Sequence, residues 1–210
     1  MTSQVFIYGE KEITHLKKAD TALGRAIDLI GHIERPVNPD LFSSLVNSIV
    51  AQQISSKAAN TVWKRMVERF GEITPETINS ASVDDIQQCG ISMRKATYIK
   101  DTAEKVVSGK FNIDALHSMS DEELGKKLSE LKGIGLWTAE MLMIFSMQRP
   151  NILSWDDLAI QRGLRMLYKH RKITKELFQK YKRRYSPYAT VASLYLWAIA
   201  GGTYGYYEPE

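Results

Sequence analysis

The sequence predicts an all-α fold, and three observations lead to this prediction. Apolar residues recur at helical spacing, as in the stripe of Leu41, Leu45 and Ile49. Signals that start and stop helices recur along the whole chain. Strand patterning is nearly absent, because only residues 5–8 could pair, and one short isolated segment cannot make a sheet.

Caps and glycines justify the individual elements. Ser120 and Glu123 form a capping box, and Thr74-Pro75 and Ser186-Pro187 each place a cap residue before a proline at the first helical position. Glycines follow several periodic segments, where helix ends favour a left-handed residue: Gly71, Gly90 and Gly109. The expected helices, in chain order, cover residues 20–31, 39–52, 56–70, 82–89, 92–108, 120–131, 136–147, 157–169, 174–185 and 187–200.

Composition excludes several classes of protein. The chain has 210 residues, of which 44% are hydrophobic and 25% charged, which excludes disorder, a collagen-like fibre and a disulfide scaffold. A lone cysteine, Cys89, can form neither an internal disulfide nor a four-cysteine iron–sulfur cluster. The polar N-terminus is not a signal peptide, and the longest apolar runs, 141–147 and 194–200, are too short to span a bilayer. We therefore expect a soluble cytoplasmic protein without membrane contact.

Positive charge is concentrated in one segment. Between Gln161 and Tyr185 the net charge is +9, whereas the rest of the chain carries −5. A basic block on a mildly acidic body suggests a polyanionic partner, nucleic acid first, although a solvated helix face explains the charge equally well. The basic residues are Arg162, Arg165, Lys169, Arg171, Lys172, Lys175, Lys180, Lys182, Arg183 and Arg184.

The segment 131–140 joins two helical patterns through a short turn with two glycines. Gly133 and Gly135 permit positive φ and close backbone approach, and Ile134 between them is expected to plug the gap between the helices. The amides at the start of the second helix, near Leu136, form a natural cradle for a phosphate. A simple helix–turn–helix connection ended by a glycine cap explains the same pattern.

Leu131-Lys-Gly-Ile-Gly135 before an apolar helix resembles the helix–hairpin–helix element of DNA-binding and repair proteins. Asp157 follows Trp137 by twenty residues, and Arg162 follows Asp157 by five. Together with Leu45–Ser55 and Met93–Ile99, this order resembles the helix–hairpin–helix base-excision DNA glycosylase superfamily over residues 38–200.

Within this superfamily the chain is most similar to the alkylation-repair branch, 3-methyladenine DNA glycosylase II. Bifunctional members carry a lysine where this chain has Trp137, and tryptophan has no amine to form a Schiff base. The chain departs from the longer bacterial members, because about forty residues precede the core, too few for their N-terminal β-rich domain. The resemblance implies a two-lobed all-α fold with the active site in the cleft between lobes. One lobe would cover residues 41–147, and residues 1–40 with 148–210 would form the other.

The implied function is that of a monofunctional glycosylase. It would flip out alkylated purines, such as 3-methyladenine or 7-methylguanine, and excise them from double-stranded DNA. A glycosylase for oxidised or deaminated bases and a non-catalytic binder of damaged DNA are the alternatives. The resemblance further implies a monomer acting in the nucleoid or nucleus.

The resemblance assigns the catalytic role to Asp157. A carboxylate there would stabilise the positive charge that develops on the deoxyribose and orient the attacking water. The alternative is that Asp156 and Asp157 merely cap the following helix, and Asp156 is the expected cap.

Two aromatic residues are assigned to the base pocket by the same resemblance, namely Trp137 and Trp197. Their π faces would favour positively charged alkylated purines. For Trp197, plain core packing is equally compatible with its apolar surroundings, and Trp155 and Tyr195 are expected to be structural.

The remaining DNA contacts are also implied by resemblance. Gln53 would fill the gap left by the extruded base, unless the two glutamines are only a solvated helix end. The amides of Gly133, Gly135 and Thr138 would bind a phosphate. No cofactor is required, but backbone carbonyls of the hairpin would hold a monovalent cation, Na⁺ or K⁺: those of Ser129, Leu131 and Ile134.

Overall fold

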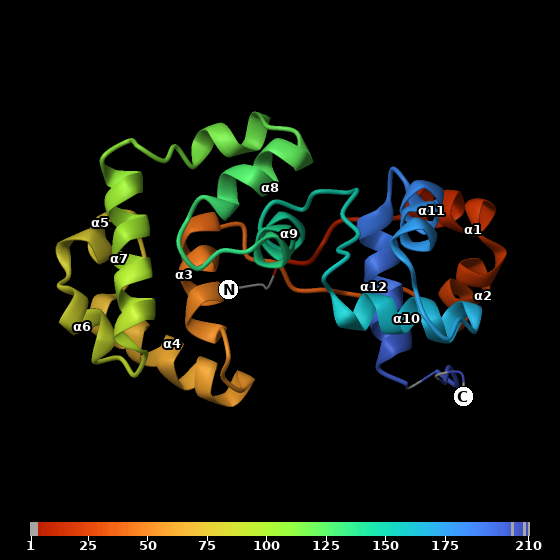
Figure 1. Cartoon of the computed structure of the whole chain (residues 1–210), viewed down its shortest axis with the longest axis horizontal. Helices are drawn as coiled ribbons and strands as arrows, with labels where there is room; N and C mark the ends of the chain where they lie inside the picture. Colours follow the sequence, from red (N-terminus) through yellow and green to blue (C-terminus); the bar gives the residue numbers. More distant parts are fainter. Residues whose placement is uncertain (1–3, 203, 208, 210) are drawn as a thin grey trace. The chain divides into compact units, whose positions relative to one another are not determined.

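The computed structural model describes residues 4–202, 204–207 and 209, and it confirms the all-α fold (Figure 1). The described residues contain no strand; the antiparallel bridge between Val5 and Pro36 is isolated. The helices are α1 (Glu10–Ala19), α2 (Thr21–Ile30), α3 (Leu41–Ala51), α4 (Ser56–Phe70), α5 (Pro75–Ser80), α6 (Val83–Gln87), α7 (Met93–Val107), the 3-10 helix η1 (Asp114–Ser118), α8 (Asp121–Ser129), α9 (Leu136–Phe145), α10 (Leu158–Tyr168), α11 (Lys175–Tyr185) and α12 (Ala189–Ala200).

Every expected helix is present, and three further elements, α1, α5 and η1, lie outside the expected ranges, although Thr74-Pro75 indicated the start of α5. Helix α1 has only Leu16 buried, so no broad apolar stripe marks it in the sequence, and the residue before it, Gly9, has no side chain that could signal a cap. Elements α5 and η1 are each shorter than two turns, and so short a segment shows no periodicity.

The predicted caps are confirmed with one exception. Ser120 and Glu123 form the capping box of α8, and Thr74 caps α5 with Pro75 in the first turn. Ser186 does not start a helix. It is the C-cap of α11, and its backbone amide donates a hydrogen bond to the Lys182 carbonyl. Helix α12 begins later, at Ala189.

The chain divides into two compact units. Unit 1 comprises residues 1–37 and 143–210, and unit 2 comprises residues 38–142. The sequence analysis placed these boundaries after residues 40 and 147. Helix α9 begins in unit 2 and ends in unit 1. No helix in the part of the chain that the structure describes is long and apolar enough to cross a membrane.

Helix α12 is the core of unit 1, where it packs against α2, α10 and α11 (Figure 1). Nearly all of its residues are buried, as expected for a helix that is apolar all round. Its contact with α10 is closest at Gly163. A Cβ at this position would lie 2.3 Å from the carbonyl oxygen of Leu196, so only glycine permits this approach of the two helices.

A buried ion pair links α2 to α11 in unit 1. Asp20 caps α2 by accepting the Leu23 amide at 2.9 Å and also accepts from the Arg184 guanidinium. Burial alone would raise the pKa of Asp20, but the hydrogen bonds from Leu23 and Arg184 lower it below the ordinary value of 3.8. The carboxylate is therefore charged in the folded state at neutral pH.

The N-terminal segment of unit 1 is joined to residues distant in sequence. The Phe6 amide donates to the Arg35 carbonyl at 2.8 Å, and the Ile7 amide donates to the Gln148 side chain at 2.8 Å. The Tyr8 hydroxyl accepts the Ile33 amide at 2.7 Å. These bonds explain why the extended segment is ordered although it belongs to no sheet.

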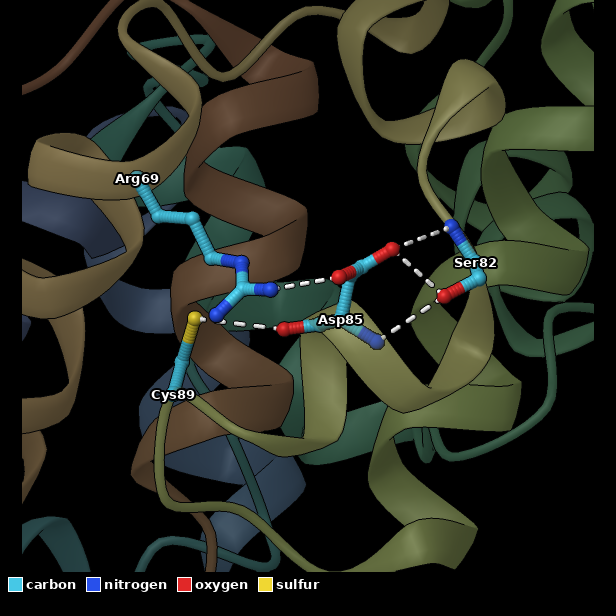
Figure 2. A network of polar contacts seen from close by, with 4 residues as sticks. All are labelled: Arg69, Ser82, Asp85 and Cys89. Carbon is cyan, nitrogen blue, oxygen red and sulfur yellow. Dashed lines mark hydrogen bonds and ion pairs between the residues drawn. The ribbon is translucent and has the colours of Figure 1, made fainter.

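In unit 2, α3 and α7 pack together, with α4 beside α3 and with α5 and α6 beside α7. The short helix α6 is held by a polar network centred on Asp85 (Figure 2). Asp85 accepts from the Ser82 hydroxyl at 2.6 Å and pairs with Arg69, and these bonds lower the pKa of Asp85. Cys89 is buried beside this network, and burial raises the pKa of its thiol.

Replacing Asp20 by Asn should lower the free energy of unfolding by about 1–2 kcal/mol at pH 7, because the side chain still caps α2 but loses the charge paired with Arg184. The charge contribution exists above pH 3.8 and is lost as pH falls through the lowered folded pKa. Urea unfolding from pH 7 to pH 2 should therefore show weaker acid destabilisation in the variant. Asp28→Asn, at an exposed ion pair with Lys17, is the control and should behave as wild type.

Replacing Gly163 by Ala should destabilise unit 1 by at least about 1–3 kcal/mol, because the new methyl group collides with the Leu196 carbonyl. In an uncrowded helix the same change would increase stability by up to about 1 kcal/mol through helix propensity. Thermal unfolding decides between the two outcomes, and a rise in the midpoint would contradict the close approach.

Candidate active site

Asp157 lies at the N-terminus of α10 and is its N-cap. Its Oδ1 accepts the backbone amides of Ala159 at 3.0 Å and Ile160 at 2.9 Å, and the residue is only 7% exposed. The positive end of the α10 dipole further favours an anionic side chain here. The expectation that Asp156 caps the helix is wrong, since Asp156 is exposed and the capping bonds come from Asp157. Asp157 thus caps the helix, and capping does not exclude the catalytic role predicted for the same carboxylate.

Trp197, on α12, lies directly beside this carboxylate. Its indole Nε1–H donates to Asp157 Oδ1 at 3.2 Å, and the side chain is half-buried. Unit 1 thus brings together two of the residues that the sequence assigned to the site. Because α10 and α12 approach closely at Gly163, the helices that carry Asp157 and Trp197 lie next to each other. An indole whose N–H contacts a carboxylate has a polar role that plain core packing does not require.

Phe145 stacks beside Trp197 and Arg35 lies over Phe145, and neither residue was predicted from the sequence. The Phe145 ring stacks on Trp197 with centroids 5.6 Å apart and an interplanar angle of 28°. The Arg35 guanidinium carbon lies 5.2 Å from the Phe145 ring centroid. Phe145 ends an apolar helix and Arg35 lies in an irregular segment, so no local pattern distinguishes them from packing and solvated residues.

The other two aromatic residues considered are structural. The Trp155 ring packs edge-on against Phe178, with centroids 5.2 Å apart, and Lys175 lies over it. Tyr195 is fully buried, and its hydroxyl donates to the Gly31 carbonyl at 3.0 Å. Burial raises the pKa of Tyr195, so the phenol is neutral and serves as a fixed donor.

The hairpin of unit 2 connects α8 to α9. Gly133 has φ +86°, and a Cβ there would lie 2.7 Å from Cδ2 of Tyr98, so conformation and space both require glycine. Gly135 does not use the positive-φ freedom that the sequence suggested. It starts the helix, because its carbonyl accepts the Ala139 amide at 2.9 Å, and a Cβ there would meet open space. The backbone at Gly135 is therefore accessible to a partner.

The remaining hairpin residues differ in exposure. Ile134 is buried, as its predicted role as a plug requires. Thr138 is buried as well, and its assignment as a phosphate contact stays a prediction. Trp137, in the first turn of α9, is 46% exposed. Its large aromatic face is thus accessible, and its assignment to the base pocket stays a prediction.

The turn between α3 and α4 carries the predicted wedge. Gln53 is exposed and adopts φ +58°, which is uncommon for a residue with a side chain. The neighbouring Gln52 donates through Nε2 to the Gly133 carbonyl at 2.6 Å, so this turn and the hairpin lie side by side in unit 2. Ile54 follows with 40% of its surface exposed. The geometry separates the two glutamines, because Gln52 is held by the hairpin whereas Gln53 faces solvent.

The basic block extends over α10, α11 and their connection in unit 1. Its charges are not equivalent. Arg184 is paired with the buried Asp20, whereas Lys172, Lys180 and Arg183 are exposed. Within the described residues, no group of three or more His, Cys, Asp or Glu side chains is placed to hold a metal ion.

The chain is similar to known DNA repair proteins in sequence. Residues 46–187 match the family model described as HhH-GPD superfamily base excision DNA repair protein. The chain is 35% identical to DNA-3-methyladenine glycosylase 1 of Schizosaccharomyces pombe over 192 residues, which cover 87% of this chain and 84% of that protein.

Solved structures give the same result. A DNA-3-methyladenine glycosidase from Bacillus halodurans superposes with a TM-score of 0.85 at 36% identity, covering 94% of this chain and 93% of that one. The S. pombe 3-methyladenine DNA glycosylase in complex with abasic DNA gives 0.77 at 33% identity, covering 91% and 97%. The chain belongs to the HhH-GPD superfamily of base excision DNA repair proteins, in the branch of the DNA-3-methyladenine glycosylases.

Proposed function

We infer that this protein is a DNA glycosylase of the 3-methyladenine type. It hydrolyses the N-glycosidic bond of alkylated purines in double-stranded DNA and leaves an abasic site. The observation that carries this inference is the Asp157 carboxylate, which is buried and held by three N–H donors, one of them from Trp197. The relatives of this chain, named for action on 3-methyladenine, support the substrate class.

Asp157 would act by electrostatics. Cleavage of the glycosidic bond leaves positive charge on the deoxyribose, and a nearby anion lowers the energy of that state. The amides of Ala159 and Ile160 fix Oδ1, so the carboxylate needs no reorganisation when the charge develops. The same group can orient the water that attacks the sugar.

Trp197 would contribute an aromatic surface to base recognition. Purines alkylated at N3 or N7 carry positive charge, and stacking of such a base on an indole ring contributes about 1–2 kcal/mol. A cationic base is also a good leaving group and requires little help from a general acid. Trp137 is the second aromatic residue proposed for the pocket, and its exposure is compatible with this role. Because its side chain has no amine, we propose that the enzyme lacks lyase activity.

DNA binding would combine several contacts. The backbone amides of Gly133, Gly135 and Thr138 bind a phosphate at the start of α9, and Gln53 fills the gap left by the extruded base. The exposed part of the basic block adds affinity that falls with added salt. We propose that the protein acts as a monomer on damaged duplex DNA, in the nucleoid or nucleus.

A monovalent cation is compatible with the hairpin. The Leu131 carbonyl accepts the Ile134 amide at 3.0 Å and keeps a second lone pair for a ligand. The proposed ligands are this carbonyl and those of Ser129 and Ile134. When bound, the cation would supply positive charge next to the DNA phosphate.

The test of the function is base release from methylated duplex DNA by Asp157→Asn. Asparagine still caps α10, so folding should be retained, but loss of the negative charge should reduce excision by about 100-fold or more. Affinity for abasic duplex should change little. Asp156→Asn, at the exposed neighbouring position, is the matched control and should remain active. An active Asp157→Asn enzyme would remove Asp157 from the catalytic role.

A second test separates the polar role of Trp197 from its packing. Trp197→Phe keeps a ring stacked on Phe145 but loses the N–H that holds Asp157, so excision should fall by about threefold to tenfold while the thermal midpoint stays close to wild type. Trp197→Ala should lose both activity and stability. If activity and stability fall in proportion in both variants, the role of Trp197 is core packing alone. Trp155→Phe is the control for an aromatic residue outside the site.

A further inference from the structure

The first turns of α7 carry two side chains that reach both candidate DNA contacts of unit 2. Lys95 Nζ donates to the backbone carbonyls of Val50 at 2.9 Å and Gln52 at 2.5 Å, at the C-terminal end of α3. Tyr98, one turn further along α7, fills the space beside Gly133 in which a Cβ would lie. Residues three positions apart share a helix face, so one face of α7 contacts the turn that carries Gln53 and the hairpin together.

Lys95 occupies a place that is unfavourable for a cation. It is the third residue of α7, where the helix dipole is positive, and Arg94 precedes it. Burial and the Arg94 charge both lower the pKa of Lys95 below 10.5. The terminal carbonyls of α3 offset the unfavourable position of the Lys95 charge, because the last carbonyls of a helix lack intrahelical donors and carry negative partial charge. Helix stability alone would not select a lysine at this position.

Gln52 links α7 to the hairpin through two hydrogen bonds. Its backbone carbonyl accepts from Lys95, and its side-chain amide donates to the Gly133 carbonyl. Gln53, the next residue, has its unusual positive φ where the chain leaves this bonded residue. Lys95 and Gln52 thus fix the backbone on the N-terminal side of Gln53, and Tyr98 and Gln52 fix the hairpin at Gly133.

We propose that Lys95 and Tyr98 are positioning residues that hold the Gln53 turn and the phosphate-binding hairpin in one fixed arrangement within unit 2. The wedge and the phosphate contact then meet a distorted duplex together, without ordering either loop during binding. Discrimination of damaged from intact DNA depends on this arrangement, whereas general attraction to DNA does not. The inference rests on the proposed glycosylase function for its biological meaning, but the coupling itself can be measured without excision.

The first measurement is hydrogen–deuterium exchange on the DNA-free protein, with Lys95→Met compared with Lys100→Met. Lys100 lies on the same helix and also donates to a backbone carbonyl, that of Asn79, so it is a matched control. Lys95→Met should speed exchange in residues 50–56 and also in residues 131–137, whereas Lys100→Met should leave both segments unchanged. The thermal midpoint of Lys95→Met should not fall below that of the control, because a cation is removed from a helix start.

The second measurement is affinity for a duplex containing a tetrahydrofuran abasic analogue, relative to the undamaged duplex. Lys95→Met should reduce this preference about tenfold and change affinity for undamaged DNA by less than about threefold. Lys95→Arg, which keeps the donors, should restore most of the preference. Unchanged exchange, equal effects in the Lys100→Met control or a retained preference would each overturn the proposal. Absence of excision by wild type, with the exchange and affinity effects as expected, would instead refute the glycosylase function alone.

Discussion

A carboxylate can stay buried only when hydrogen bonds replace the water it has lost, and the packing of unit 1 provides such bonds around Asp157. Asp157 meets it with two amides of its own helix and one indole of α12. The indole reaches the carboxylate because α10 and α12 approach as closely as Gly163 permits. The orientation of Trp197 in turn sets the stack with Phe145. Helix packing, capping and the chemistry of the site thus depend on the same few contacts.

Local sequence patterns were sufficient to predict part of this architecture. Apolar periodicity, the capping box at Ser120 and the turn at Gly133 correctly gave most helices and the hairpin. Asp157 and Trp197 were assigned through motif order, and their mutual contact agrees with that assignment. Helix α1 was missed because it buries a single leucine. The sequence does not distinguish the two hairpin glycines, because glycine permits positive φ without requiring it, and only Gly133 adopts it.

The remaining contacts could not be predicted, since they join residues far apart in the chain. Lys95 meets Val50 across 45 residues, and Gln52 meets Gly133 across 81. Gly163 lies against a backbone carbonyl of another helix, and a pattern of side chains in the sequence cannot indicate such a contact. A lysine at the third position of a helix was the one local sign that a distant acceptor was present. The net charge of the basic block also overstates its unpaired charge, because Arg184 forms an ion pair with Asp20 that no local pattern indicates.

The division of the chain also has a consequence for biosynthesis. Unit 2 is continuous, whereas unit 1 is assembled from the two segments that precede and follow unit 2. On the ribosome, α1 and α2 emerge before unit 2, yet α12, which covers α2, is made only after the whole of unit 2. At about 5–20 residues per second, the early helices wait on the order of 10–30 s with apolar side chains uncovered. Newly made chains are therefore most exposed to aggregation and chaperone capture before translation ends.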